Sequence, residues 1–312
     1  MSTVEFRPSQ RHGRFTIPRT SMLPSFAVLS LLSALAYALR SIVTKQSMPG
    51  LPLGLMLLLQ SSMCAAMLFA LSRGQSVVLA PPRRTYRLYG SRMVWGGLTT
   101  LLQFYCLQKM PASLATALSY TAPLFTAVLA PMLLRERSTL AILLTTTVGF
   151  GGVALNALPY LDTVQLFYIG VGLLSGFVNA MMQISIRGAA AEGEPGLRGV
   201  FWMHAATAAG ACCACVFDDT WSLTVEQVLA CVVIAVLSVL AQLTNAAAYA
   251  RGSALPVNAL SFLTLPMTVG LTVVLLGEQV SLLVGAGMGI TLPAAFTLVW
   301  LEQKRRDTIL AP

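Results

Sequence analysis

Polar side chains recur at a spacing of four residues within two apolar segments of this chain. Residues four apart lie on one face of an α-helix, so each segment predicts a helix that carries a polar stripe. Hydroxyl, amide, aromatic and cationic groups together suit the recognition of a small polar molecule. The stripes are Ser33, Tyr37, Ser41 and Lys45 in the first segment, and Ser175, Asn179, Gln183 and Arg187 in the second.

The two stripes match position by position at a constant offset of 142 residues, and the same offset pairs further polar residues. Polar groups are costly in hydrocarbon, so in membrane helices they usually face the bundle interior or a water-filled cavity. Hydrogen bonding between helices is the alternative use of such residues. The further pairs are Ser62 with His204, Thr100 with Gln242, and Gln103 with Asn245.

From these stripes we expect a central cavity that binds a small-molecule substrate. Arg40 lies about one turn from Tyr37, where its guanidinium could pair with a substrate carboxylate, and a structural role for it is equally open. The candidate substrate-binding residues are Tyr37, Arg40, Gln103, Asn179, Gln183, His204, Gln242 and Asn245.

His204 and the cysteines at 212, 213 and 215 suggest a metal site at first sight. Helical spacing separates His204 from Cys215 by about 16 Å along the axis, whereas zinc ligands lie about 2 Å from one point. We therefore expect no metal and no cofactor. We also expect no enzyme, because no carboxylate within a span could orient His204 and the other histidine, His12, lies in the amino-terminal arm.

The elements that must position these residues are membrane-spanning helices. The chain has 312 residues, of which 56% are hydrophobic and 10% charged, whereas soluble proteins carry about 25% charged residues. Apolar runs of about 20 residues cross the bilayer as helices. Ten such runs lie near 24–44, 51–72, 91–107, 112–134, 139–158, 163–186, 199–217, 226–248, 256–277 and 281–301.

The net charge of +9 is a topology signal rather than a nucleic-acid footprint. Cytoplasmic loops of membrane proteins collect Lys and Arg. With the amino terminus inside, all of the 20 basic residues except Arg40, Lys45 and Lys109 fall on the inner side. We therefore expect a multi-pass protein of the cell (inner) membrane, with both termini cytoplasmic and the lipid bilayer as its surroundings.

A longer repeat contains the polar stripes. "LSYTAPLFTAVLAPMLLRE" at 118–136 returns as "LSFLTLPMTVGLTVVLLGE" at 260–278, again 142 residues later. Five helices per unit is an odd number, so the second unit enters the membrane from the opposite side. The predicted fold is thus an all-α integral membrane protein with ten transmembrane helices in two inverted five-helix repeats. Its parts are a basic arm at 1–23, repeats at 24–158 and 163–301, and a tail at 302–312.

An alternative for the amino terminus is a secretory signal cleaved near "ALA" at 34–36. Cleavage there would remove the first span and break the repeat.

The ten-helix pattern, the inner amino-terminal arm and the "Pro … Leu-Leu-x-Glu" element together resemble the drug/metabolite transporter superfamily, in its EamA-like branch. The resemblance covers about 24–301 and implies transport of small metabolites such as amino acids and their derivatives, nucleosides, vitamins or drugs. The matching positions are Pro123 with Glu136, and Pro266 with Glu278.

Both prolines fall inside predicted spans, where a proline kinks a helix. Pro123 and Pro266 are therefore candidate hinges, with a static kink as the alternative. Glu136 and Glu278 sit at span ends and fit a structural role, next to Ser138 and Ser281 as candidate N-caps. No other acidic residue falls in a span, so a carboxylate proton relay is not supported.

The sequence thus predicts a secondary transporter of small polar metabolites, such as amino acids or their derivatives, that works by alternating access. The family resemblance favours export. Uptake by the same fold, a non-transporting scaffold and a membrane-embedded enzyme are the alternatives. The GxxxG spacings Gly172 with Gly176 and Gly285 with Gly289 predict close helix packing and leave a homodimer open.

Overall fold

The computed structural model consists of α-helices and short 3₁₀ turns in the part of the chain that it describes. That part comprises residues 23–47, 50–122, 124–126, 128–129, 140–161, 164, 166–215, 223–251, 257, 260–277 and 279–310. No strand occurs within these ranges.

The helices of the first half are α1 (Leu23–Ser47), α2 (Leu53–Gly74), α3 (Tyr86–Lys109), α4 (Ala112–Ser119) and α6 (Leu140–Ala157). Two 3₁₀ turns accompany them, η1 (Arg83–Thr85) before α3 and η2 (Leu158–Tyr160) after α6. The helices of the second half are α7 (Leu166–Ala191), α8 (Gly196–Cys215), α9 (Val225–Arg251), α11 (Thr264–Leu276) and α12 (Leu282–Leu310).

Local sequence explains several of these boundaries. Pro52 and Pro111 immediately precede α2 and α4, where the missing proline N–H is not needed by the helix. Gly277 ends α11 in the left-handed conformation, with φ of +66°, which glycine adopts without a Cβ clash. Among the described helices, α1, α2, α7 and α9 are long and apolar enough to cross a membrane.

Two of the predicted spans are interrupted rather than continuous. After α4 the chain makes a turn at Tyr120 and Thr121, and before α11 it makes a turn at Phe262 and Leu263. These turns are 142 residues apart, so the interruption recurs at equivalent positions. The predicted spans 112–134 and 256–277 are therefore wrong as single helices over their described parts.

The last helix continues into the predicted carboxyl-terminal tail. The last span is predicted to end near residue 301, and α12 continues to Leu310. The added turns contain Lys304, Arg305 and Arg306, residues with good helix propensity.

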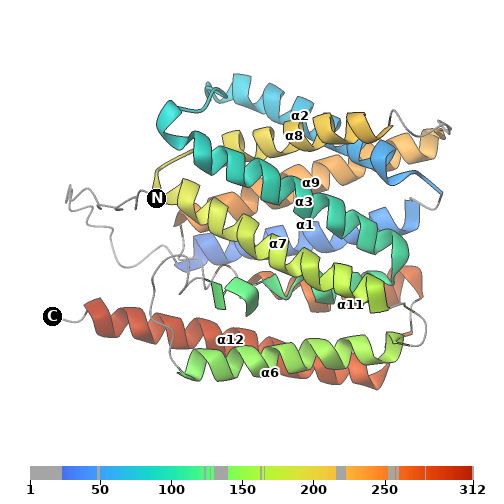
Figure 1. The fold of residues 1–312 in the computed structure, drawn as a ribbon, viewed down its shortest axis with the longest axis vertical. Coiled ribbons are helices and arrows are strands. Elements are labelled where there is room, and N and C mark those ends of the chain that lie inside the picture. Colours follow the sequence, from blue (N-terminus) through green and yellow to red (C-terminus); the bar gives the residue numbers. More distant parts are fainter. Residues whose placement is uncertain are drawn as a thin grey trace, which may run out of the picture.

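The helices form one bundle in which segments of the two halves interleave (Figure 1). Helix α1 packs along α9, α3 along α7, α2 along α8, and α6 along α12. The α6–α12 pair lies at one edge of the view and the α2–α8 pair at the other, with α4 and α11 next to α6 and α12. We call the end at which α1 begins and α12 ends, at the left in Figure 1, the proximal end, and the opposite end the distal end.

The outer surface of the bundle is strongly apolar. Large side chains such as Leu140, Leu166, Val225, Val274 and Leu282 are each more than half exposed. A soluble monomer rarely exposes contiguous apolar patches of this kind, so the surface fits a lipid environment. The interior holds many buried hydroxyl and amide side chains, which places the polar groups at the centre of the bundle.

Candidate functional site

A polar cavity lies at the centre of the bundle, between α1, α3, α7 and α9. Side chains next to the interrupted segments complete its wall. Its volume is about 40 Å³. It is lined by Ser30, Ser33, Ala34, Tyr37, Arg40, Thr99, Thr100, Gln103, Tyr120, Ala122, Asn179, Met182, Gln183, Met203, Gln242, Asn245, Val257, Ser261 and Thr264.

The structure brings together the predicted substrate-binding residues with one exception. Tyr37, Arg40, Gln103, Asn179, Gln183, Gln242 and Asn245 all line the cavity. His204 does not line it but lies directly behind, with its Nε2 2.9 Å from Nε2 of Gln242.

Arg40 is the charged group of the cavity wall. It is only 3% exposed, and its Nη2 donates a 2.6 Å hydrogen bond to Oε1 of Gln103. Its guanidinium carbon lies 4.9 Å from the centre of the Tyr37 ring and 5.3 Å from that of Phe104. Both distances are typical of cation–π contact.

Several polar atoms around the cavity are only partly satisfied. Nδ2 of Asn179 donates to the Ser119 carbonyl over a long 3.4 Å. Oε1 of Gln183 and Nε of Arg40 have no hydrogen-bond partner among the described residues. Buried polar atoms are normally paired, so unpaired ones beside a cavity are suited to a polar ligand.

The cavity wall is built from equivalent positions of the two halves. At the offset of 142 residues, Tyr37 corresponds to Asn179, and Gln103 corresponds to Asn245. Three further pairs in which both members line the cavity are Arg40 with Met182, Thr100 with Gln242, and Ala122 with Thr264. The two halves therefore contribute equivalent backbone positions to the wall, but the side chains at these positions differ in type.

Sequence reasoning missed the part of the wall supplied by Ser30, Thr99, Tyr120, Ser261 and Thr264. Tyr120, Ser261 and Thr264 lie beside the two interruptions, which a continuous helix would place differently. The local signal for them is weak, because the turns at 120–121 and 262–263 contain neither Gly nor Pro.

The cavity is small in this structure. A single water needs roughly 10–15 Å³ of such space, so about 40 Å³ holds only a few waters. A molecule the size of an amino acid does not fit. Helices around the cavity must separate before such a molecule can enter or leave.

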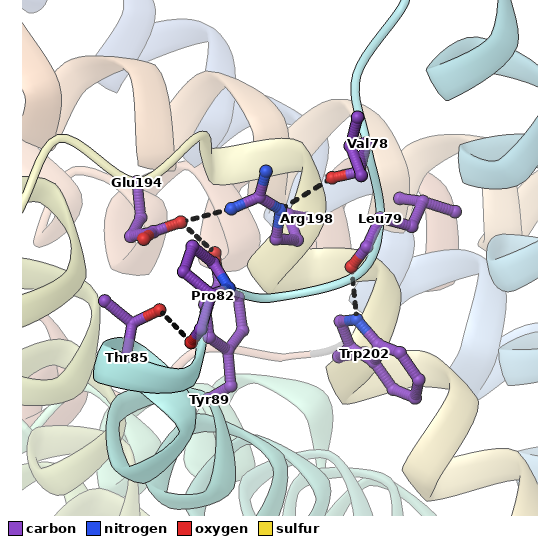
Figure 2. Close-up of polar contacts among 8 residues, drawn as sticks. All are labelled: Val78, Leu79, Pro82, Thr85, Tyr89, Glu194, Arg198 and Trp202. Carbon is purple, nitrogen blue, oxygen red and sulfur yellow. Dashed lines mark hydrogen bonds and ion pairs between the residues drawn. The ribbon is translucent and has the colours of Figure 1, made fainter.

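At the proximal end, a polar clasp joins the two halves (Figure 2). Oε2 of Glu194 accepts a 2.7 Å hydrogen bond from the Tyr89 hydroxyl and forms an ion pair with Arg198. The Arg198 Nε donates to the Val78 carbonyl at 2.7 Å, and the Trp202 Nε1 donates to the Leu79 carbonyl at 2.8 Å. The turn between α7 and α8 is thus fastened to the connection between α2 and α3.

The charge and hydrogen bonds of the clasp favour the ionised form of Glu194. Desolvation raises the pKa of the Glu194 carboxyl, but the Tyr89 hydrogen bond and the Arg198 charge lower it more, so the pKa lies below its ordinary value. The side chain of Glu194 is only 5% exposed and that of Arg198 12%. Glu194 therefore stays ionised at neutral pH, in the form that accepts both bonds.

At the distal end, aromatic and aliphatic side chains of the two halves meet. The rings of Tyr105 and Tyr168 are tilted by 52° with centres 6.1 Å apart, and Leu107 and Met110 share one buried cluster with Ile169. Within the first half, the Lys45 Nζ donates to the Leu107 and Met110 carbonyls at 3.1 and 3.0 Å.

Of the predicted hinges, only Pro266 is described. It is the third residue of α11, in the first turn, where its missing N–H breaks no helical hydrogen bond. The expected kink inside a helix is therefore wrong for Pro266, and the chain bends at the preceding turn instead. Pro123, Glu136, Glu278 and Ser138 lie outside the described residues. Ser281 is confirmed as an N-cap of α12, since its Oγ accepts from the Val284 N–H at 3.4 Å.

The two GxxxG spacings have different surroundings. A Cβ at Gly172 would lie 2.9 Å from Cβ of Leu118, and one at Gly176 would lie 2.7 Å from the Leu118 carbonyl oxygen. These glycines therefore let α7 approach α4 within the chain. Gly285 and Gly289 have open space beside them.

Comparisons with known proteins agree with this architecture. Residues 25–158 match the family model described as "EamA-like transporter family". An uncharacterized transporter of Helicobacter pylori is 38% identical over 96 residues, which is 31% of this chain and 32% of that protein. The pseudopaline exporter CntI of Pseudomonas aeruginosa is 24% identical over 166 residues, 53% of this chain and 58% of that protein.

The similarity to these relatives spans only part of their length, about a third for the first and somewhat over half for the second. A solved crystal structure superimposes with a TM-score of 0.67 at 18% identity, covering 89% of this chain and 96% of the other. At that identity the likeness concerns the fold. The apolar helices, the family match and the transporter relatives point in one direction: residues 25–158 of the chain are similar to the EamA-like transporter family, and the helices have the composition of a membrane protein.

Proposed function

We propose that this protein is a secondary transporter that moves small polar metabolites, such as amino acids or their derivatives, across the cytoplasmic membrane by alternating access. The observation that carries the proposal is the buried cavity, whose polar wall is built from equivalent positions of both halves. A scaffold has no need of such a cavity.

We further propose that residues 24–158 and 163–301 are inverted repeats, with ten spans in all. The packing supports this, because exchanging each helix for its equivalent reproduces the most extensive helix pairings. The pairing of α1 with α9 becomes that of α7 with α3, and α3 with α8 becomes α9 with α2. The α1–α11 contact likewise becomes α7–α4, and α2–α8 and α6–α12 map onto themselves.

Inverted repeats offer a physical route to alternating access. If the halves are related by an axis in the membrane plane, each can adopt the conformation of the other. The exchange converts a state open to one side into a state of similar energy open to the other. The cavity at the interface of the halves then faces each side in turn.

Charge supports a cytoplasmic assignment of the proximal end. Basic residues at that end of the described helices include Arg73, Arg87, Arg187, Arg198 and Arg251. At the distal end they are Lys45 and Lys109. Positively charged loops stay in the cytoplasm, so the proximal end and both termini belong there.

Export is the proposed direction, supported by the similarity to a protein named as an exporter. Uptake by the same fold is the alternative.

Reconstitution tests the proposal. Purified protein is placed in liposomes loaded with a total small-molecule extract, and mass spectrometry identifies compounds that leave faster than from empty liposomes. We expect selective loss of a few polar compounds, slowed by Asn179→Ala and by Asn245→Ala. The matched control is Gln75→Ala, which removes an exposed amide outside the cavity. No selective loss under any imposed ion gradient would contradict transport.

A further inference from the structure

We propose that the transported molecule carries a carboxylate, and that the Arg40 guanidinium binds it inside the cavity. This inference rests on the proposed transport function and adds the chemical class of the substrate.

Arg40 brings a positive charge into the cavity wall. An arginine side chain is not deprotonated in proteins, and a buried cation without a counter-ion is unfavourable in a membrane protein. No aspartate or glutamate is found among the described residues that line the cavity, and Arg40 has no carboxylate partner among them. Within the described part of the chain, the positive charge of Arg40 therefore has no counter-ion.

The Arg40 guanidinium also has N–H donors that a ligand could use. A guanidinium has five N–H donors in a planar fork that matches a carboxylate with two parallel bonds. The Nη2 of Arg40 donates to Oε1 of Gln103, and its Nε donor has no acceptor among the described residues. The rings of Tyr37 and Phe104 hold the guanidinium in place and leave this donor capacity free for a ligand.

The side of the cavity formed by the second half is neutral. Met182, at the position equivalent to Arg40, is neutral, and the amides of Asn179, Gln183 and Asn245 accompany it. One wall is therefore cationic, and the other offers amides and an apolar thioether. A ligand that matches both walls has a carboxylate at one end and neutral polar or apolar groups at the other.

The test replaces Gln103, the neighbour of Arg40, by a glutamate whose carboxylate can pair with Arg40 in place of the substrate. Gln103→Glu changes the 2.6 Å hydrogen-bond acceptor of Arg40 into an anion of nearly the same shape. We expect this variant to keep or raise its thermal unfolding midpoint, because Arg40 gains a counter-ion. Export of carboxylates should nevertheless fall about tenfold to a hundredfold, the range for losing a hydrogen bond to a charged group. If Arg40 serves only packing, Gln103→Glu leaves transport unchanged.

The experiment uses proteoliposomes that contain the full chain, loaded with the total small-molecule extract and read by mass spectrometry. Wild type, Gln103→Glu and Arg40→Gln are compared with Arg73→Gln, which removes an exposed charge outside the cavity. The proposal predicts that the compounds exported by wild type carry carboxylates, and that both cavity variants lose them while Arg73→Gln does not.

Export of compounds without a carboxylate, phosphate esters included, would overturn the inference and leave the proposed transport function standing. Carboxylate export at the wild-type rate in both cavity variants would overturn it as well. A wild type that exports nothing would overturn the transport function and this inference together.

Discussion

The two ends of the bundle hold the halves together by different means. At the proximal end, directional bonds from Tyr89, Arg198 and Trp202 fasten one half to the other. At the distal end, aromatic and aliphatic side chains of the halves meet, as Tyr105 and Tyr168 do. Directional bonds define one geometry, whereas apolar contacts act mainly through the area that they bury.

This difference suggests how each end opens. A neutral hydrogen bond adds only about 1 kcal/mol net, and one to a charged group about 1.5–3 kcal/mol, because water replaces it when it breaks. A clasp at the membrane surface can therefore be exchanged for water at low cost and behaves as a latch. Opening the distal end exposes apolar side chains that have no such substitute, so that end behaves as a packed plug.

The largest expected effect comes from locking the latch. In a Tyr89→Cys, Glu194→Cys double variant, a reducible bis-methanethiosulfonate linker joins the halves at the proximal end. Alternating access requires that end to open, so transport should fall to the background of empty liposomes, and a reductant should restore it.

Linker-treated wild type controls for reaction at the native cysteines, two of which, Cys212 and Cys213, are exposed. Each single-cysteine variant controls for loss of the clasp itself. Undiminished transport by the cross-linked protein would show that the proximal end does not open in the cycle.

A smaller effect is expected from overfilling the contact between α4 and α7 toward the distal end. A Cβ at Gly176 would clash with the Leu118 carbonyl oxygen and with the Thr121 hydroxyl. Gly176→Ala should therefore destabilise the protein by about 1–3 kcal/mol, seen as a lower unfolding midpoint in detergent. Gly170→Ala in the same helix has open space beside it and should be neutral or stabilising by up to about 1 kcal/mol. Equal midpoints for the two variants would refute the close contact.

Removing one charge from the latch should have a milder effect. Glu194→Gln keeps the side-chain shape and an acceptor oxygen but loses the charge that pairs with Arg198, and the difference between a charged and a neutral hydrogen bond is about 1 kcal/mol. Hydrogen exchange at the amides of residues 77–80 should become several-fold faster. Glu192→Gln removes an exposed charge two residues away and should leave exchange unchanged. An equal response from the two variants would mean that the clasp does not hold the connection.

The smallest expected effect is that of acid on the clasp around Glu194. The pKa of Glu194 is lowered in the folded protein, so its stabilisation is present at neutral pH and is lost only as pH falls through this lowered value. Hydrogen exchange at residues 77–80 should thus be flat from pH 7 to about 5 after correction for intrinsic rates, and should rise below the ordinary glutamate pKa of about 4.3. An increase already complete at pH 6 would contradict the ionised clasp.

The sequence predicted the cavity better than the ends. The stripe from Ser33 to Lys45 and its equivalent from Ser175 to Arg187 follow helical periodicity, which local sequence determines. The turns at 120–121 and 262–263 escaped prediction, because Tyr-Thr and Phe-Leu carry no turn signal. The clasp joins Arg198 to Val78, 120 residues apart, and the small size of the cavity depends on packing of the whole bundle. Neither the clasp contact nor the size of the cavity can be predicted from a local sequence pattern.

The most direct test of alternating access through this cavity is labelling of one cavity cysteine from each side of the membrane. Asn179→Cys places a thiol in the wall, and a membrane-impermeant thiol reagent is applied to right-side-out and to inside-out vesicles. Site-resolved mass spectrometry, with wild type as background, measures modification at residue 179. The account predicts modification from both sides and protection by the transported compound. Modification from one side alone, or from neither, would contradict it.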